Sequence, residues 1–164
     1  MKLLKKEKTN TKQSEKFGKR VLIPLLSKKE ASKEFVKKIA GEKGEIILLL
    51  VIDTGAMSGG FGFAAHEIAQ GNLLMQKTKI LLEKHKKKCN DVIEWGNTES
   101  KIEHLAQLQQ VNKILLVQQE SPAFGKLLRE MKEKLKGIEI ETVKVKEEEK
   151  KESSGFSLHR PHLP

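Results

Sequence analysis

The stretch that decides the fold is Glu45–Asp53, EIILLLVID. From Ile46 to Val51 its aliphatic residues follow one another without a polar break. Side chains of a strand point alternately to the two faces of a sheet, so a strand with one exposed face alternates apolar and polar residues. An unbroken Ile/Leu/Val run is typical of a strand covered on both faces. The stretch therefore predicts an α/β fold, with helices on each side of a parallel sheet.

The segments on either side alternate between strand and helix patterns. Apolar runs predict further strands at Arg20–Leu26, Asp91–Trp95, Asn112–Gln119 and Ile138–Val145. Apolar stripes at helical spacing predict helices at Lys29–Gly41, His66–Lys88, Glu99–Gln110 and from Ser121 to Leu135. Ser27, Thr98 and Ser121 are the predicted N-caps, and Pro122 suits the first helical position. This order of elements predicts a doubly wound, five-stranded parallel sheet with helices on both faces.

The globular part is bounded by two segments of different composition. With 164 residues, the chain has the length of one domain, which we place at residues 20–145. Residues 1–19 are polar and rich in lysine, and residues 146–164 are charged and then rich in Ser and Pro. Neither segment has enough apolar surface to repay the entropy of ordering. We therefore expect a basic flexible arm before the domain and a disordered tail after it.

The charge balance and the single cysteine restrict the classes of partner. Lys and Arg number 32 against 22 Asp and Glu, a net charge of +10. The basic arm contains no arginine for bidentate phosphate contacts, so a solvated lysine-rich surface is favoured over nucleic-acid binding. Cys89 alone cannot form an internal disulfide or a thiolate metal site. No apolar run approaches the ~18 residues of a membrane span, and no signal-peptide core is present, which predicts a cytoplasmic protein without a membrane partner.

No arrangement typical of catalysis is present. We find neither a pair of carboxylates suited to acid–base chemistry nor a serine elbow. Cys89 has His85 four residues before it, but both lie in a lysine-rich helix end without a third group to orient them. His66 and His85 are about five helical turns apart, too far to share a metal. The sequence therefore predicts no catalytic residue and no metal site.

The glycine-rich loop Asp53–Phe63 allows two interpretations. Residues Gly60 to Ala65 formally fit the GxGxxA dinucleotide fingerprint. The match begins several residues after the strand ends, and no acidic residue follows at the required spacing. A flexible loop with Phe61 and Phe63 against the sheet is favoured over a phosphate cradle.

Several stretches together resemble the universal stress protein family. They are RVLIPLLSKKEAS from Arg20, EIILLLVID, a long helix, a strand followed by GNTESKI from Gly96, and KILLV from Lys113. The resemblance covers about residues 20–145. It implies the strand order 3-2-1-4-5 and a ligand crevice at the carboxyl ends of the first and fourth strands. The candidate crevice residues are Ser27, Asp53, Gln118, Ser121 and Gly125.

Two departures from the family bear on ATP binding. Nucleotide-binding members carry an aspartate just after the first-strand proline, and Leu26 stands at that position here. They also carry a glycine-rich motif after the fourth strand, where Gln118–Gly125 has one glycine and the carboxylate of Glu120. A phosphate needs closely approaching backbone amides and a positive field. We therefore predict a non-enzymatic domain of this type that binds a partner or small ligand and takes no ATP cofactor through the family motif. The alternative is an ATP- or AMP-binding protein with a phosphate loop rebuilt at Gly59–Gly62.

The last predicted strand, Ile138–Val145, suggests a homodimer. Ile138 and Ile140 alternate with Glu139 and Glu141, which is typical of an edge strand with one wet face. Two copies related by a twofold axis could pair these edges antiparallel. The competing prediction is that the acidic segment 147–149 covers the edge and leaves a monomer.

Overall fold

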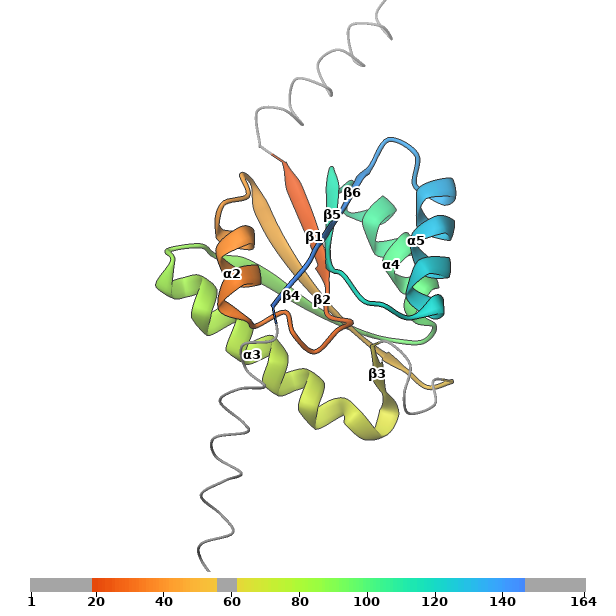
Figure 1. Ribbon diagram of the computed structural model, residues 1–164, viewed down its shortest axis with the longest axis horizontal. Helices are drawn as coiled ribbons and strands as arrows, with labels where there is room; N and C mark the ends of the chain where they lie inside the picture. Colours follow the sequence, from red (N-terminus) through yellow and green to blue (C-terminus); the bar gives the residue numbers. More distant parts are fainter. Residues whose placement is uncertain (1–18, 56–61, 147–164) are drawn as a thin grey trace, which may run out of the picture.

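The structure is a computed structural model that describes residues 19–55 and 62–146. Its strands are β1 (Arg20–Pro24), β2 (Glu45–Asp53), β3 (Phe63–Ala64), β4 (Cys89–Trp95), β5 (Lys113–Val117) and β6 (Glu139–Val143). Its helices are α2 (Lys33–Ala40), α3 (Ile68–Lys84), α4 (Thr98–Leu108) and α5 (Pro122–Lys134), with a 3₁₀ turn, η1 (Ala65–Glu67), before α3. The sheet stands between α2 and α3 on one side and α4 and α5 on the other (Figure 1).

The strands form one parallel sheet in the order β4-β2-β1-β5-β6, which confirms the predicted order 3-2-1-4-5. A sixth strand, β3, was not predicted. It pairs with the last two residues of β2, Ile52 and Asp53, beyond the point where β1 ends at Pro24. Since β4 also pairs with Ile52, β3 continues the ladder on the β1 side of β2.

The central strand β2 is covered on both faces, as its sequence predicts. Ile46, Leu48, Leu50 and Ile52 belong to the apolar cluster under α2 and α3. Ile47, Leu49 and Val51 belong to the cluster under α4 and α5. Each buried side chain of this size contributes about 1.5–3 kcal/mol. A register shift of β2 would exchange the residues of both clusters at once, so the center of the sheet is strongly specified.

Two predicted N-caps are wrong, and one is confirmed. Helix α2 is capped by Ser32 instead of Ser27, because the chain first makes a turn after β1. Helix α4 is capped by Asn97, and Thr98 is its first helical residue. Ser121 caps α5 as predicted, with Pro122 in first position. The strands β4 and β6 also differ by about two residues from their predicted ends.

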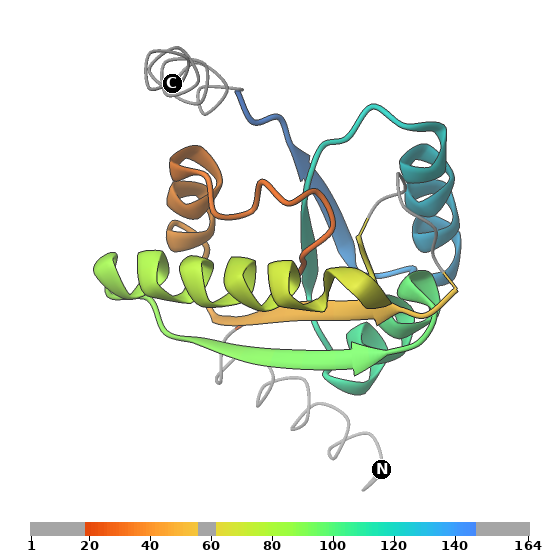
Figure 2. The same cartoon turned by 90° about the horizontal axis from the view of Figure 1, so that it is seen from below.

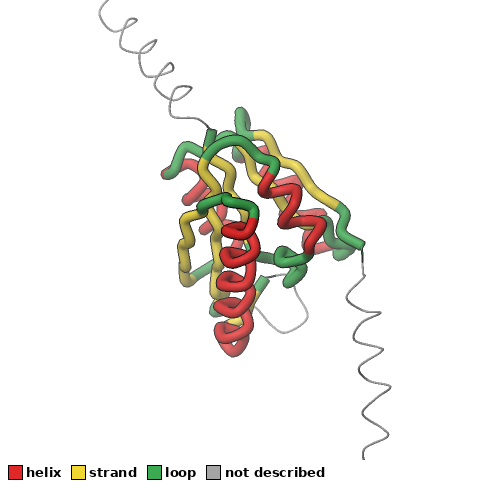
Figure 3. The backbone as a smooth tube through the Cα atoms, turned by 90° about the vertical axis from the view of Figure 1, so that its left-hand side faces the viewer, coloured by secondary structure: helices red, strands yellow, loops and turns green. Residues whose placement is uncertain are grey.

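Helix α3 lies along β2 and β4, and its fit depends on a glycine (Figures 2 and 3). A Cβ atom on Gly71 would lie 2.8 Å from Cδ1 of Leu50 in β2, so glycine permits the close approach. The helix ends at Lys84, earlier than predicted, and the next residue, His85, is exposed. Within residues 19–55 and 62–146, no helix combines the length and apolar character needed to cross a membrane.

Candidate functional site

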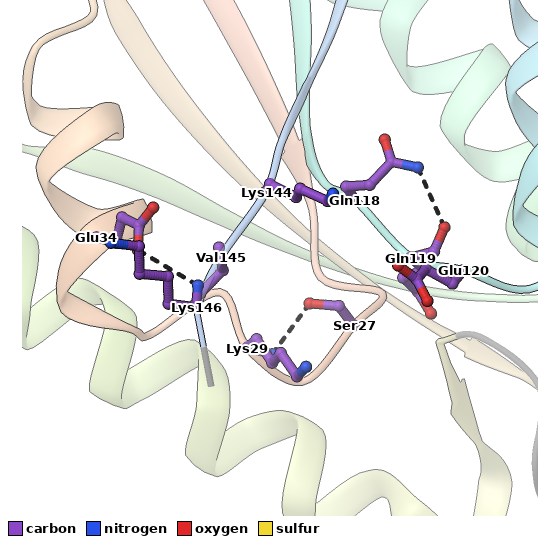
Figure 4. A pocket seen from close by; sticks show the side chains of 9 residues that line it. All are labelled: Ser27, Lys29, Glu34, Gln118, Gln119, Glu120, Lys144, Val145 and Lys146. Atoms are coloured by element: carbon purple, nitrogen blue, oxygen red, sulfur yellow. Dashed lines mark hydrogen bonds between the residues drawn. The ribbon is translucent and has the colours of Figure 1, made fainter. Parts of the chain in front are cut away.

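A crevice opens where the sheet changes its direction of winding. Strands β1 and β5 are neighbours, but α2 follows β1 on one face and α5 follows β5 on the other (Figure 1). Ligands of doubly wound sheets bind at such switch points. The crevice has a volume of about 810 Å³, in the range of small-molecule sites. Its lining residues are Ser27, Lys29, Glu34, Gln118, Gln119, Glu120, Lys144, Val145 and Lys146 (Figure 4).

The β1 side of the crevice is a turn built on a buried carboxyl group, Glu30. One oxygen of Glu30, Oε2, accepts from the Leu26 amide at 3.0 Å and from both the amide and the hydroxyl of Ser27 at 2.9 Å. Burial raises the pKa of Glu30, and these hydrogen bonds offset part of that rise. Its other oxygen, Oε1, is buried and has no partner within the described part of the chain. One oxygen of this carboxyl group therefore fixes the turn through its bonds to Leu26 and Ser27.

Leu26 is the residue that the sequence resemblance matches to an aspartate of nucleotide-binding family members. Its side chain is 3% exposed and packs in the cluster under α4 and α5. Its amide donates to Glu30, and its carbonyl accepts from the Gly62 amide at 2.7 Å. The Leu26 side chain thus packs in the core, and its backbone amide and carbonyl are both hydrogen-bonded. It places no polar side chain in the crevice.

The β5 side of the crevice is not shaped as a phosphate cradle. Pro122 has no N–H, and the Phe124 amide donates to Ser121 Oγ at 3.1 Å. Two of the first three residues of α5 therefore cannot donate to a phosphate. Gly125 is not required for a close approach, because a Cβ there would meet Arg129 at an ordinary 3.7 Å. Glu120 adds a negative charge to the lining.

A third side of the crevice comes from the residues after β6. Lys144, Val145 and Lys146 follow that strand toward the carboxyl edge of the sheet (Figure 4). The Lys146 amide donates to Oε1 of Glu34 in α2 at 3.3 Å. The sequence analysis missed these side chains, because it placed Lys144 in the edge strand 138–145 and Lys146 in the tail. With Lys29, they bring three lysines to the lining.

The five predicted crevice residues are only partly brought together. Ser27 and Gln118 line the crevice, whereas Asp53, Ser121 and Gly125 are not among its lining residues. Asp53 instead holds the start of α4: its Oδ2 accepts from the amide and the hydroxyl of Thr98 at 3.1 and 3.0 Å. Its Oδ1 accepts from the amide of Gly55 at 2.9 Å. These contacts give Asp53 a structural role in the described chain.

The glycine-rich loop can be followed only at its ends. Gly59, Gly60 and Phe61, which belong to the predicted fingerprint and to the alternative phosphate loop, lie outside the described residues. Gly62 has φ of +83°, a conformation that favours glycine, and its amide is bonded to Leu26. Phe63 is 1% exposed and packs in the cluster under α3, as predicted.

Several titratable side chains also lie outside the crevice. Among residues 19–55 and 62–146, no group of three His, Cys, Asp or Glu residues could hold a metal ion. Burial raises the pKa of the Cys89 thiol, which makes it less reactive. Burial and a hydrogen bond to Glu130 raise the pKa of Glu99 on the surface between α4 and α5. Sequence reasoning missed this pair of carboxyl groups, because it depends on the contact of two helices.

Comparisons with known proteins identify the fold. Models of protein families give no match to this sequence, and curated proteins give none either. Among solved structures, the universal stress protein from Archaeoglobus fulgidus has a TM-score of 0.56 at 10% identity, over 78% of this chain and 93% of that one. Hypothetical protein MJ0577 has a TM-score of 0.54 at 21% identity, over 78% and 96%.

A universal stress protein family protein from Arabidopsis thaliana, solved with AMP bound, has a TM-score of 0.52 at 12% identity, over 78% of this chain and 92% of that one. At such identities the similarity is one of fold. It covers the α/β architecture, a parallel sheet with its helices. The chain therefore has a universal stress protein-like fold.

Proposed function

We propose that this protein is a non-enzymatic, universal stress protein-like domain that binds a small anion in its crevice and does not bind ATP through a glycine motif. A contact between copies is the second part of the proposal. The observation that carries the first part is the connection from β5 to α5. There the helix amides that would hold a phosphate are absent at Pro122 or bonded at Phe124.

The lining favours an anion held by side chains instead of backbone amides. Lys29 comes from the turn after β1, and Lys144 and Lys146 come from the segment after β6. Two carboxylates, Glu34 and Glu120, leave an excess of one positive charge among these groups. Lysine supplies a mobile point charge without the planar geometry of arginine. Such a lining suits a small carboxylate or phosphate compound that carries no base for stacking.

Thermal unfolding with added nucleotide tests the absence of ATP binding. ATP and AMP at millimolar concentration are compared with sodium triphosphate at matched ionic strength. A ligand at 100 times its Kd stabilises by about 2.7 kcal/mol, which raises Tm by several degrees. We expect no rise that requires adenosine. A rise with ATP or AMP but not with triphosphate would support the alternative, a nucleotide site with a rebuilt phosphate loop.

Titration with pyrophosphate and with citrate tests the anion site itself. We expect at least one of them to raise the Tm of the wild type and to lose most of this effect in Lys144→Gln. Lys132→Gln, a change on the exposed side of α5, is the matched control and should respond like the wild type. If the two variants respond alike, the anion binds to the basic surface in general, and the crevice proposal fails.

A further inference from the structure

The hydroxyl group of Ser27 is held in one orientation where it lines the crevice. It donates to Oε2 of Glu30 at 2.9 Å and accepts from the backbone amide of Lys29 at 3.0 Å. A serine hydroxyl has one donor hydrogen and two acceptor lone pairs. The two contacts use the hydrogen and one lone pair, so Ser27 can make a further hydrogen bond only as an acceptor.

The direction of the hydrogen bond between Ser27 and Glu30 follows from the amides beside it. Oε2 of Glu30 also accepts from the backbone amides of Leu26 and Ser27, at 3.0 and 2.9 Å, and an amide N–H can only donate. A proton on this carboxyl group would be carried by Oε1, which accepts no hydrogen bond within the described part of the chain. Oε2 is therefore an acceptor in either protonation state, and the Ser27 hydroxyl remains the donor to it.

A ligand in the crevice meets Ser27 and not the carboxyl group behind it. Ser27 is half-buried and lines the crevice (Figure 4), whereas Glu30 is 0% exposed. The remaining lone pair of the Ser27 hydroxyl is thus a neutral acceptor on the wall of the crevice. Unlike the carboxylates of Glu34 and Glu120, which also line the crevice, it does not repel an anion.

The fixed hydroxyl of Ser27 selects for a hydrogen-bond donor on the ligand. The lysines of the lining suit any anion, and the side-chain amides of Gln118 and Gln119 each contain both a donor and an acceptor. An ammonium group as the donor is disfavoured by the three lysines of the lining. We propose that the crevice takes a small hydroxylated anion, either a hydroxycarboxylate or a hydroxylated phosphate, whose hydroxyl group donates to Ser27. This inference rests on the proposed anion site and names the class of its ligand.

Matched pairs of anions test this inference by isothermal titration calorimetry. Citrate is compared with tricarballylate, and glycerol 3-phosphate is compared with propyl phosphate, because the members of each pair differ only in their hydroxyl groups. The net contribution of one hydrogen bond corresponds to about a 3- to 10-fold change in Kd. We expect the hydroxylated member of at least one pair to bind the wild type more tightly by this factor. The pair that shows the preference identifies the anionic group as carboxylate or phosphate.

Ser27→Ala tests whether the preference comes from this hydroxyl. Without the acceptor, we expect the two members of the pair to bind with equal Kd, while the member that lacks the hydroxyl keeps its wild-type Kd. A purely structural role of Ser27 would instead weaken both members by the same factor. Ser100→Ala, a matched change at an exposed position of α4, should keep the preference. Circular dichroism verifies that each variant is folded.

Failure of this inference is distinguishable from failure of the anion site. If the members of both pairs bind the wild type equally and lose binding in Lys144→Gln, the anion site stands and the requirement for a hydroxyl is wrong. A preference that persists in Ser27→Ala also overturns the inference, because the ligand hydroxyl then donates to another group. If no anion of either pair binds in a manner that depends on Lys144, the anion site is wrong, and this inference is wrong with it.

Discussion

The two edges of the sheet are built in opposite ways. On β6 the apolar side chains are turned to the core: Val143 packs in the cluster under α2 and α3, and Ile140 packs in the cluster under α4 and α5. On β4, Ile93 and Trp95 project into solvent. An exposed strand edge is a template for pairing with another chain, and proteins blunt such edges with charges. Of the two edge strands, β6 has the more extensive network of charged contacts.

That network ties β6 to the middle of the domain. Lys113 at the start of β5 lies 3.0 Å from Glu42 and also pairs with Glu139 and Glu141 of β6. Lys38 of α2 lies 3.0 Å from Glu141. At β4, by contrast, Asp91 pairs with Lys79 and Glu94 pairs with Lys101, two separate ion pairs that share no cation. The difference indicates that charged contacts anchor β6 to the rest of the domain more extensively than β4. The homodimer predicted through residues 138–145 stays a prediction.

Removal of the central cation should have the largest effect. The Lys113 side chain is 14% exposed, and Lys113→Met would leave the carboxylates of Glu42 and Glu141 with Lys38 as their remaining shared cation. Loss of one member of a buried ion pair costs about 3 kcal/mol or more. We expect a decrease of about 3 kcal/mol in the free energy of unfolding, measured with urea at 1 µM protein. Lys79→Met at the opposite edge should cost at most about 0.5 kcal/mol. Equal losses would remove the distinction between the edges.

Truncation of apolar side chains should have an intermediate effect that differs between the edges. Val143→Ala removes methyl groups from a half-buried position against the core and should cost about 1.5 kcal/mol. Ile93→Ala should change the stability of the monomer by about 0.5 kcal/mol or less, because the side chain is exposed. The comparison is contradicted if Ile93→Ala destabilises the monomer as much as Val143→Ala does.

Acid should loosen β6 by a smaller amount. Hydrogen bonds with Lys113 and Lys38 lower the pKa of Glu141, so the folded state holds its proton less tightly than the unfolded state. The stability from this group is present above the ordinary glutamate pKa and is lost as the pH falls through the lowered value. With Glu141 about one-third exposed, we expect on the order of 1 kcal/mol. The loss is measured as the difference between the wild type and Glu141→Gln from pH 6 to pH 3. A constant difference would exclude this contribution.

The center of the sheet could be predicted from the sequence, because an aliphatic run such as β2 fits few environments. The contacts of Ser27 and Thr98 could not be predicted. Local patterns assign both residues to helix caps, whereas in the structure Ser27 donates to Glu30 and Thr98 donates to Asp53. The lysines that close the crevice were missed for a related reason. They reach it only because β6 lies parallel to β5 and returns the chain to the carboxyl edge.

The exposed face of β4 was also not predicted. A short strand pattern such as DVIEW does not reveal whether its apolar residues meet a helix or solvent. Here α3 lies above β2, held there by the approach at Gly71, and does not extend over Ile93 and Trp95. The pattern of one strand therefore indicated its type but not its neighbours.

The buried carboxyl group of Glu30 restricts which side chains position 26 can carry. An aspartate at position 26 would stand in a site that is 3% exposed, on the residue whose amide already binds Glu30 at 3.0 Å. Two carboxylates so close in a buried site disfavour each other's charge. An aspartate at position 26 should therefore be tolerated better once Glu30 has been replaced, so the effects of the two substitutions on stability should not add.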